Sequence, residues 1–356
     1  MVFTFGASSY LNEQEPWSAL RAAFPTAAII GCSTAGEIHD ESVEDESLSV
    51  LVALFERTRV RVAEDRLTAG ESFEVGARMG RALRGEDLRA VFVLSDGLDV
   101  NGTQLAAGLG SVLLTVPTSG GLAGDGTRFQ KTWVLANGKP TAGVVSAIGF
   151  YGDALRVGHG SKGGWDKFGP ERRITRAKDN VLHELDERPA LDVYERYLGE
   201  LAAGLPATAL LYPIAIRNDR SSTEQLVRTV LKHSAEERSL TFAGDMPVGA
   251  LAQLMRANLD RLVQAAQEAA LSTAREIPAS ACIAVSCVGR RLVLGSRTED
   301  ELAAVKEALP PGCELAGFYS YGELSPRDGH GGQLHNQTMT LTTFAEIPCI
   351  PSSRDS

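Results

Sequence analysis

The chain has 356 residues, of which 44% are hydrophobic and 22% are charged, and its formal net charge is −10. This length corresponds to about two domains, and the composition excludes disordered, collagen-like and coiled-coil chains. Because the excess of acids repels phosphate groups, we expect neither nucleic acid nor a membrane surface as a partner.

The apolar runs predict three segments with a common plan: strand, helix, strand, a glycine-rich turn with an acid, and returning strands. The first spans residues 2–55, with a helix at 13–24 and the turn GCSTAGE at 31–37. The second spans 89–151, with a helix at 101–109, a strand at 111–116 and the turn SGGLAGDG at 119–126. The third spans 281–344, with a strand-like run at 281–295, a helix at 299–309 and the turn GFYSYGE at 317–323.

In each segment the turn places a glycine directly before an acid, as Gly36–Glu37, Gly124–Asp125 and Gly322–Glu323. Glycine contributes 36 residues, about a tenth of the chain, against a usual share of roughly 7%. Because glycine tolerates positive φ and a closely approaching backbone, such a turn can hold its acid at the edge of a pocket. Three matches in one strand order predict a repeated architecture.

The stretch between the second and third segments follows a different pattern. We expect two strands around a glycine-rich loop at 153–177, a helix at 180–197 that is broken near Pro189, a buried strand at 205–217, a hairpin at 226–242 and the longest helix at 248–271. The last prediction rests on apolar residues that recur at three- and four-residue steps, namely Leu251, Leu254, Met255, Leu259 and Leu262.

The predicted fold is α/β, with two domains of mixed or antiparallel sheets flanked by helices and built from repeated strand–helix–strand–glycine turn–strand units. The short returning strands argue against a wholly parallel sheet. We place the first domain at residues 1–178, the second at 179–347 and a polar tail at 348–356.

Cysteine usage and the N-terminal residues indicate a cytoplasmic protein. None of the five cysteines belongs to a C-x-x-C pair, so we expect neither a disulfide framework nor a thiolate zinc site. No apolar run approaches the roughly 18 residues of a membrane span, and the first residues lack the basic start of a signal peptide.

The sequence lacks the common catalytic motifs, including the G-x-S-x-G elbow, the G-x-G-x-x-G fingerprint, the phosphate-binding loop and the H-E-x-x-H zinc motif. We therefore expect a protein without catalytic activity. Cys32, Cys287 and Ser33 are the candidate nucleophiles if the chain is instead an unrecognised hydrolase or thiol enzyme. The alternative for both cysteines is a buried, unreactive thiol.

A haem site needs only one axial histidine, so it does not depend on a metal-ligand spacing among the six histidines. The candidate haem ligands are His183, expected on a helix, and His335, expected at the start of a strand. We expect no other cofactor and no bound metal ion.

The glycine turns mainly predict a site for a small ligand. Glu37 and Glu323 can receive an ammonium group, and Arg290, beside Arg291, can receive a carboxylate, a combination that suits a zwitterionic amino acid. The alternative is that the acids accept hydrogen bonds from backbone amides and only hold the turns together. The predicted ligand-binding residues are Cys32, Ser33, Thr34, Glu37, Gly121, Asp125, Cys287, Arg290, Ser320, Tyr321, Glu323, His335 and Asn336.

These motifs also resemble those of a known family. GCSTAGEI is similar to the signature of the FIST N domain, VPTSGGLAGDG to its second glycine motif, and HELDERPALDVYERYLG to the segment that joins it to the FIST C domain. ACIAVSCVGRR and GFYSYGELSP, followed by LHNQTMTLTTF, resemble the two signatures of the FIST C domain. On this resemblance, residues 1–178 are a FIST N-like domain and residues 179–347 a FIST C-like domain.

The resemblance implies a sensory module of intracellular signal transduction that binds a small ligand, with amino acids among the candidates. Bacterial members of the family are often linked to histidine kinases, diguanylate cyclases or chemoreceptors, which implies a separate partner of one of these kinds. Some members bind haem and respond to nitric oxide, so a haem-binding nitric oxide sensor is the alternative function.

Overall fold

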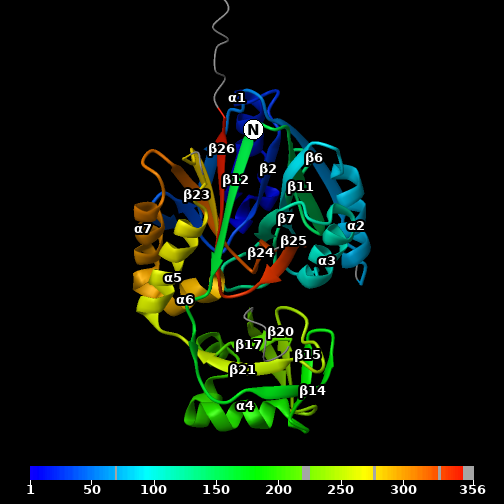
Figure 1. Ribbon diagram of the computed structural model, residues 1–356, viewed down its shortest axis with the longest axis vertical. Helices are drawn as coiled ribbons and strands as arrows, with labels where there is room; N and C mark the ends of the chain where they lie inside the picture. The colour runs from blue at the N-terminus through cyan, green and yellow to red at the C-terminus, as the bar shows by residue number, and fades with distance from the viewer. Residues whose placement is uncertain (69, 219–224, 276–277, 328–329, 348–356) are drawn as a thin grey trace, which may run out of the picture.

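The described residues form four β-sheets, three of them in a body and one in a smaller lobe that lies beneath it in Figure 1. The structure is a computed structural model, and it describes residues 1–68, 70–218, 225–275, 278–327 and 330–347. The body consists of the described residues within 1–162 and 259–347, and the lobe of those within 166–256. Mixed and antiparallel sheets with helices on their outer faces confirm the predicted α/β fold.

The body contains three units of the predicted plan. The first consists of β1 (Val2–Gly6), η1 (Ser8–Asn12), α1 (Glu15–Ala23), β2 (Ile29–Ser33), β3 (Glu37–His39), β4 (Ser42–Glu44) and β5 (Leu48–Val52). The second consists of β7 (Leu88–Ser95), α3 (Gly102–Leu113), β8 (Thr118–Leu122), β9 (Val134–Ala136), β10 (Lys139–Thr141) and β11 (Val144–Tyr151). The third consists of β22 (Ala281–Cys287), α6 (Val288–Leu294), η4 (Gly295–Arg297), α7 (Thr298–Ala308), β23 (Glu314–Ser320), β24 (Gly322–Arg327), β25 (His330–His335) and β26 (Met339–Glu346). The other body elements are β6 (Arg59–Arg66), α2 (Ser72–Leu83), β12 (Leu155–Lys162) and α5 (Leu259–Ser272).

Each unit pairs its own strands in the same way. The first two strands run parallel, because a helical crossover separates them, and the last strand returns antiparallel to the first. The pairs are β1 with β2 and β5, β7 with β8 and β11, and β22 with β23 and β26. This common pairing confirms the repeat that the three glycine turns predict.

The middle hairpin of each unit leaves its own sheet and extends a neighbouring one. Hairpin β3–β4 pairs with β23, hairpin β24–β25 pairs with β8, and hairpin β9–β10 pairs with β2. The three sheets therefore share one strand order, with an additional edge strand, β6 or β12, in two of them. The exchange is cyclic, since every unit gives one hairpin and receives another.

The inner faces of the three sheets meet in one apolar core. Because side chains alternate along a strand, Phe3 and Phe5 of β1 both point inward. Phe3 packs edge-on against Phe92 of β7 with ring centroids 5.6 Å apart, and Phe5 stacks on Phe318 of β23 at 4.8 Å. Burial of one such side chain contributes roughly 1.5–3 kcal/mol, so this core holds the three units together.

Helices cover the outer faces of two of these sheets. Helices α2 and α3 lie side by side over the second unit, and α5 and α7 lie over the third (Figure 1). Close approach of α2 and α3 requires Gly76 and Gly108, where an added Cβ would lie only 2.3 Å from the Leu105 carbonyl oxygen and 2.0 Å from that of Phe73. Among the described residues, no helix has the length and apolar character that a membrane crossing requires.

The lobe is one strongly bent antiparallel sheet with a helix beneath it (Figure 1). Its elements are β13 (Asp166–Lys167), β14 (Arg172–Lys178), β15 (Val181–Leu185), β16 (Arg188–Pro189), α4 (Ala190–Leu198), η2 (Gly199–Gly204), η3 (Ala207–Leu211), β17 (Ile214–Arg217), β18 (Leu226–Arg228), β19 (Val230–Ser234), β20 (Ser239–Phe242) and β21 (Leu251–Arg256). The predicted domain boundary after residue 178 falls in the turn between β14 and β15, within the lobe.

Two helix predictions in this region are wrong over part of their length. The segment predicted as a helix at 248–271 begins as β21, and α5 starts only at Leu259, after Asn258 caps its first turn. Leu251, Leu254 and Met255 are buried on both faces of a strand, so their spacing imitates a helical stripe. The segment predicted as a helix at 180–197 begins as a tight hairpin, and only Ala190–Leu198 is helical.

Three strand predictions are also corrected. Residues 111–116, predicted as a strand, begin as the end of α3, and the strand β8 follows at Thr118–Leu122. The run at 281–295 ends as a strand at Cys287 and continues as α6. The buried strand predicted at 205–217 contains the 3₁₀ helix η3 in its first half, and only its end, β17, is a strand.

Candidate functional site

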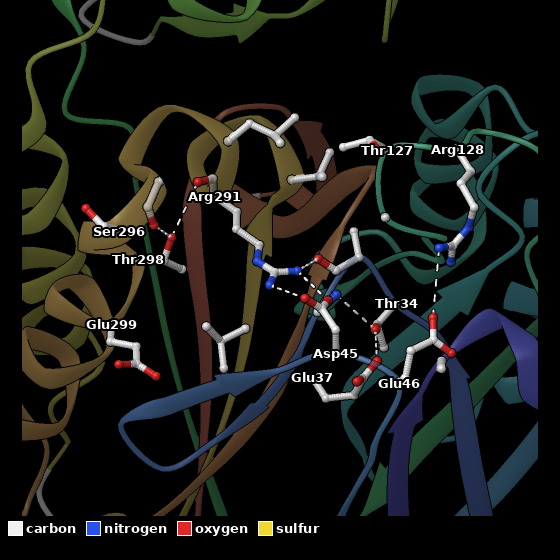
Figure 2. A pocket seen from close by; sticks show the side chains of 18 residues that line it. Thr34, Glu37, Asp45, Glu46, Thr127, Arg128, Arg291, Ser296, Thr298 and Glu299 are labelled. Atoms are coloured by element: carbon white, nitrogen blue, oxygen red, sulfur yellow. Dashed lines mark hydrogen bonds and ion pairs between the residues drawn. The ribbon is translucent and has the colours of Figure 1, made fainter.

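A cavity of about 690 Å³, here called the turn cavity, lies in the body where the first two glycine turns approach helix α6 (Figure 2). All three units contribute to its wall. The polar and charged side chains that line it belong to Thr34, Glu37, Asp45, Glu46, Thr127, Arg128, Arg291, Ser296, Thr298 and Glu299.

The first glycine turn fixes the carboxylate of Glu37 in the cavity wall. The hydroxyl of Thr34 donates to Oε1, and the backbone N–H and hydroxyl of Ser47 both donate to Oε2 at 3.0 Å. The Glu37 residue is only 3% exposed, and this burial raises the pKa of its carboxyl. A carboxylate with several fixed donors is a rigid feature of the cavity wall.

The third glycine turn repeats this arrangement outside the turn cavity. Ser320, three residues before Glu323, donates from its hydroxyl to Oε1 at 2.8 Å. Thr338 takes the place of Ser47, and its hydroxyl and backbone N–H donate to Oε2 at 2.9 and 3.2 Å. Burial raises the pKa of Glu323 to about 8. The two turns thus share a hydroxyl–acid motif as well as their glycine.

The second glycine turn lacks the hydroxyl–acid spacing of the other two. A hydroxyl residue stands three residues before the acid in the first and third turns, as Thr34 before Glu37 and Ser320 before Glu323, whereas Leu122 stands three residues before Asp125. The Gly–acid pair alone therefore does not give Asp125 the partners of the other two acids.

Asp125 accordingly has different partners. Its carboxylate accepts backbone N–H bonds from Phe129, Gln130 and Lys131 at 2.8 to 2.9 Å, and the Tyr321 hydroxyl also donates to it. The ring of Tyr321 stacks on Phe129 with centroids 4.4 Å apart. Asp125 thus orders the loop that presents Thr127 and Arg128 to the turn cavity.

Arg291 supplies the main positive charge in the turn cavity. Its two terminal nitrogens each bond a carboxylate oxygen of Asp45 at 2.7 Å, and one also donates to the Ala35 carbonyl at 2.6 Å. These hydrogen bonds raise the pKa of Arg291 and lower that of Asp45. The guanidinium also lies 5.7 Å from the ring centroid of Tyr319. The fork geometry suits a second carboxylate equally well.

Arg128 supplies a second positive charge on the opposite wall (Figure 2). It donates to the Ser8 hydroxyl at 3.0 Å and lies 3.9 Å from a carboxylate oxygen of Glu46. Both side chains of this pair are at least half exposed. The pair is therefore loose, and a ligand can exchange with either member at little cost.

The structure brings only two of the predicted ligand-binding residues, Thr34 and Glu37, into the wall of the turn cavity. Arg290, expected to receive a carboxylate, is fully buried elsewhere. It pairs with Glu301 at 2.7 Å and also donates to the carbonyls of Gly163 and Leu262 at 2.5 and 2.8 Å. Its helical neighbour Arg291 faces the cavity instead.

The candidate nucleophiles lie in the interior. Cys32 and Ser33 are completely buried and Cys287 is nearly so. Burial raises the pKa of both thiols, which disfavours the reactive thiolate. The Ser33 hydroxyl accepts a hydrogen bond from the backbone N–H of Trp133 at 3.0 Å.

The remaining predicted residues lie along β8, the third turn and β25. An added Cβ at Gly121 would lie 2.6 Å from Val285, so this glycine allows close packing of two sheets. Asn336 is buried just after β25, which ends at His335. His183 lies on strand β15 of the lobe, not on a helix, and therefore on a different sheet from His335. A haem role for either histidine stays a prediction.

Sequence reasoning missed Asp45, Glu46, Arg128 and Glu299 as parts of the site. The three acids at 44–46 look like an ordinary run of charged residues on the solvent-exposed surface. Arg128 comes just after the second glycine turn, where only the acid had been considered as a ligand-binding residue. Only the third dimension brings these residues to one cavity, because they come from all three units.

Comparison with known proteins gives one consistent family. The model of the FIST N domain matches residues 1–188, and the model of the FIST C domain matches residues 190–326. An uncharacterised protein of the archaeon Methanocaldococcus jannaschii, MJ1623, is 23% identical over an alignment 357 positions long, which covers 88% of this chain and 67% of that protein. Both matched regions contribute side chains to the turn cavity.

Proposed function

Because the chain belongs to the FIST family, whose domains are sensory domains of signal transduction, we propose that it is a sensor that binds a small ligand in the turn cavity. The proposed ligand is an amino acid, bound without catalysis. The sensor acts in the cytoplasm and relays binding to a separate signalling partner such as a histidine kinase, a diguanylate cyclase or a chemoreceptor.

The observation that carries this proposal is the charge distribution of the turn cavity. Arg291 and Arg128 approach it from two walls, and acids lie beside each of them. A zwitterion brings one carboxylate and one ammonium group, which can take the places of Asp45 on Arg291 and of Arg128 on Glu46. The volume of about 690 Å³ lies within the usual range of about 300–1,000 Å³ for ligand pockets.

The position of the cavity also suggests how binding is relayed. Asp45 follows hairpin β3–β4, which belongs to the first unit but pairs with strand β23 of the third. A ligand that displaces Asp45 from Arg291 frees this connection between the units. The position of the hairpin then differs between the empty and occupied states, and a partner can recognise that difference.

The proposal is tested by thermal unfolding of ligand-stripped protein with each standard amino acid in turn. We expect at least one amino acid to raise the Tm in a concentration-dependent way, because it binds only the native state. Arg291→Met should abolish that shift. Arg78→Met is the matched control, since Arg78 also pairs with one aspartate, Asp65, but lies on α2 outside the cavity.

The amino-acid proposal fails if no amino acid shifts the Tm and native mass spectrometry of freshly purified protein detects no bound metabolite. A shift that persists unchanged in Arg291→Met would instead move the binding site away from the turn cavity.

A further inference from the structure

A second cavity, here called the lobe cavity, lies where the lobe docks on the body and has a volume of about 280 Å³. Arg217, Arg228 and Asp245 line it from the lobe, and Thr103 and Gln333 line it from the body. Asp245 secures this docking, because its carboxylate accepts hydrogen bonds from the side chains of Asn101 and Gln104 at 2.9 Å each.

Arg228 is the unusual residue of this cavity. It is only 2% exposed, and its guanidinium packs against Gly244, where an added Cβ would be 2.8 Å from Nε. Its hydrogen bonds go to backbone carbonyls alone, at 3.1 Å to Leu334 and at 3.4 Å to Val227 and Asp245. Burial lowers the pKa of Arg228 to about 10.

Comparison with Arg290 shows what Arg228 lacks. Arg290 is equally buried, but its charge is neutralised by Glu301 at 2.7 Å. Within the described part of the chain, no carboxylate lies at ion-pair distance from Arg228, since the Asp245 side chain is used by Asn101 and Gln104. The charge of Asp245 acts on Arg228 only from beyond ion-pair distance. Because a buried charge without an ion-pair partner is destabilising, an anion in the lobe cavity would stabilise this site.

A second polar atom in the lobe cavity also lacks a partner. The side-chain oxygen Oε1 of Gln333 is buried and accepts no hydrogen bond from the described residues. It belongs to strand β25, so it approaches from the body while Arg228 approaches from the lobe. A buried acceptor requires a donor, which a ligand hydroxyl can provide.

We propose that the lobe cavity binds a small hydroxycarboxylic acid, whose carboxylate pairs with Arg228 and whose hydroxyl donates to Gln333. The ligand class follows from one cation without an ion-pair partner and one acceptor without a donor among the described lining residues, because the other lining arginine, Arg217, pairs with Glu171. The cavity volume lies just below the usual range for ligand pockets, which favours a molecule of few carbon atoms. The ligand touches both the lobe and the body, so it strengthens their docking.

Titration calorimetry with L-lactate, L-malate, propanoate and inorganic phosphate tests this proposal on the full chain. We expect a hydroxy acid to bind at one site per chain, and propanoate, which lacks the hydroxyl, to bind about 5- to 10-fold more weakly. Arg228→Met should weaken hydroxy-acid binding by about 10- to 100-fold, because it removes hydrogen bonds from a charged donor.

Two further variants separate a ligand role for Arg228 from a structural one. Arg176→Met removes an exposed arginine of the same lobe that pairs with Glu184, and it should leave hydroxy-acid binding unchanged. Gln333→Leu should weaken binding of the hydroxy acids but not of propanoate, and it gives the answer even if Arg228→Met does not fold.

The proposal is overturned if neither hydroxy acid binds, or if hydroxy-acid binding is the same in Arg228→Met as in the unmodified protein. Binding of phosphate without either hydroxy acid would overturn the assignment of a carboxylate. Equal affinities of L-lactate and propanoate would overturn the role of Gln333.

Discussion

At the scale of single residues, Glu323 links the folding of this chain to pH. It is fully buried at the third glycine turn, and burial raises the pKa of its carboxyl to about 8. In the unfolded chain the same group titrates near about 4.3. Between these two values the native state binds more protons than the unfolded state, so the free energy of unfolding decreases as pH rises.

The first prediction follows from this sign. The stabilisation from protonated Glu323 is complete below about pH 4 and is lost as the pH rises through about 8, by a total of about 5 kcal/mol. Glu323→Gln keeps a neutral side chain of the same shape, so its stability should depend less on pH. Urea unfolding of both proteins from pH 5 to 9 measures the difference. Parallel curves for the two proteins would show that Glu323 does not titrate in this range.

For the two neighbouring arginines, the sequence does not show which one faces the turn cavity. Arg290 and Arg291 are equivalent in the sequence, and a site with a carboxylate-binding arginine at this point was predictable. Successive residues of a helix point about 100° apart, so one of the pair enters the core and the other faces the turn cavity. Which of them does so depends on the position of Glu301 and Asp45, and these come from other elements.

At the scale of elements, the contact between α2 and α3 depends on glycines. A Cβ at Gly108 would lie 2.0 Å from the carbonyl oxygen of Phe73, whereas a Cβ at Gly110, on the same helix, would meet no atom within 4 Å. Both positions have the same intrinsic preference for alanine over glycine in a helix, so they form a matched pair.

The second prediction uses this pair. Gly108→Ala should destabilise the protein by about 1–3 kcal/mol, because the helices must separate to make room for the methyl group. Gly110→Ala should stabilise it by about 0.5–1 kcal/mol, since alanine favours the helix and meets open space. Chemical denaturation of the two variants measures both effects. A stabilised Gly108→Ala variant would contradict the tight packing of α2 against α3.

Elements were predictable wherever their side chains alternate or recur regularly. The repeated plan of the three units, helix α7 and hairpin β19–β20 follow directly from the sequence. Strand β8 could not be predicted in this way. It contains Gly120, which has a positive φ and packs directly against the backbone of Val93, so the strand lacks an alternating pattern of side chains. The start of β21 was mistaken for a helix because a strand buried on both faces has no period of two.

At the scale of the whole molecule, the hairpin exchange connects residues from both ends of the chain. Hairpin β3–β4 needs β23 as its neighbour, and β8 needs β24. The family order was recognisable in the sequence, and it covers both halves of the chain. The exchange of hairpins could not be predicted from the sequence. The order of strands and turns along each unit is the same whether its hairpin pairs within its own sheet or with a neighbouring sheet.

The third prediction concerns fragments cut at the predicted domain boundary. Residues 1–178 expressed alone should not fold cooperatively, because β3 and β8 lack their partner strands and expose unpaired edges. Expression together with residues 179–347 should restore soluble, folded protein. Circular dichroism and thermal unfolding of each sample test this.

Deletion of residues 166–256, with a short linker in their place, is the matching control. It removes the lobe and leaves every exchanged hairpin of the body intact, so a cooperative unfolding transition should remain. A fragment 1–178 that unfolds cooperatively by itself would contradict the dependence of hairpin β3–β4 and strand β8 on the third unit.

The cyclic exchange also determines the order in which the protein can fold during its synthesis. The lobe has all its strands by residue 256, so we expect it to fold while the ribosome is still producing the third unit. The first sheet has all its strands by residue 141, but hairpin β3–β4 and strand β8 must wait for β23 and β24, and until then β3 and β8 present open edges to other nascent chains. The period between residues 122 and 327 is therefore when this chain most needs a chaperone.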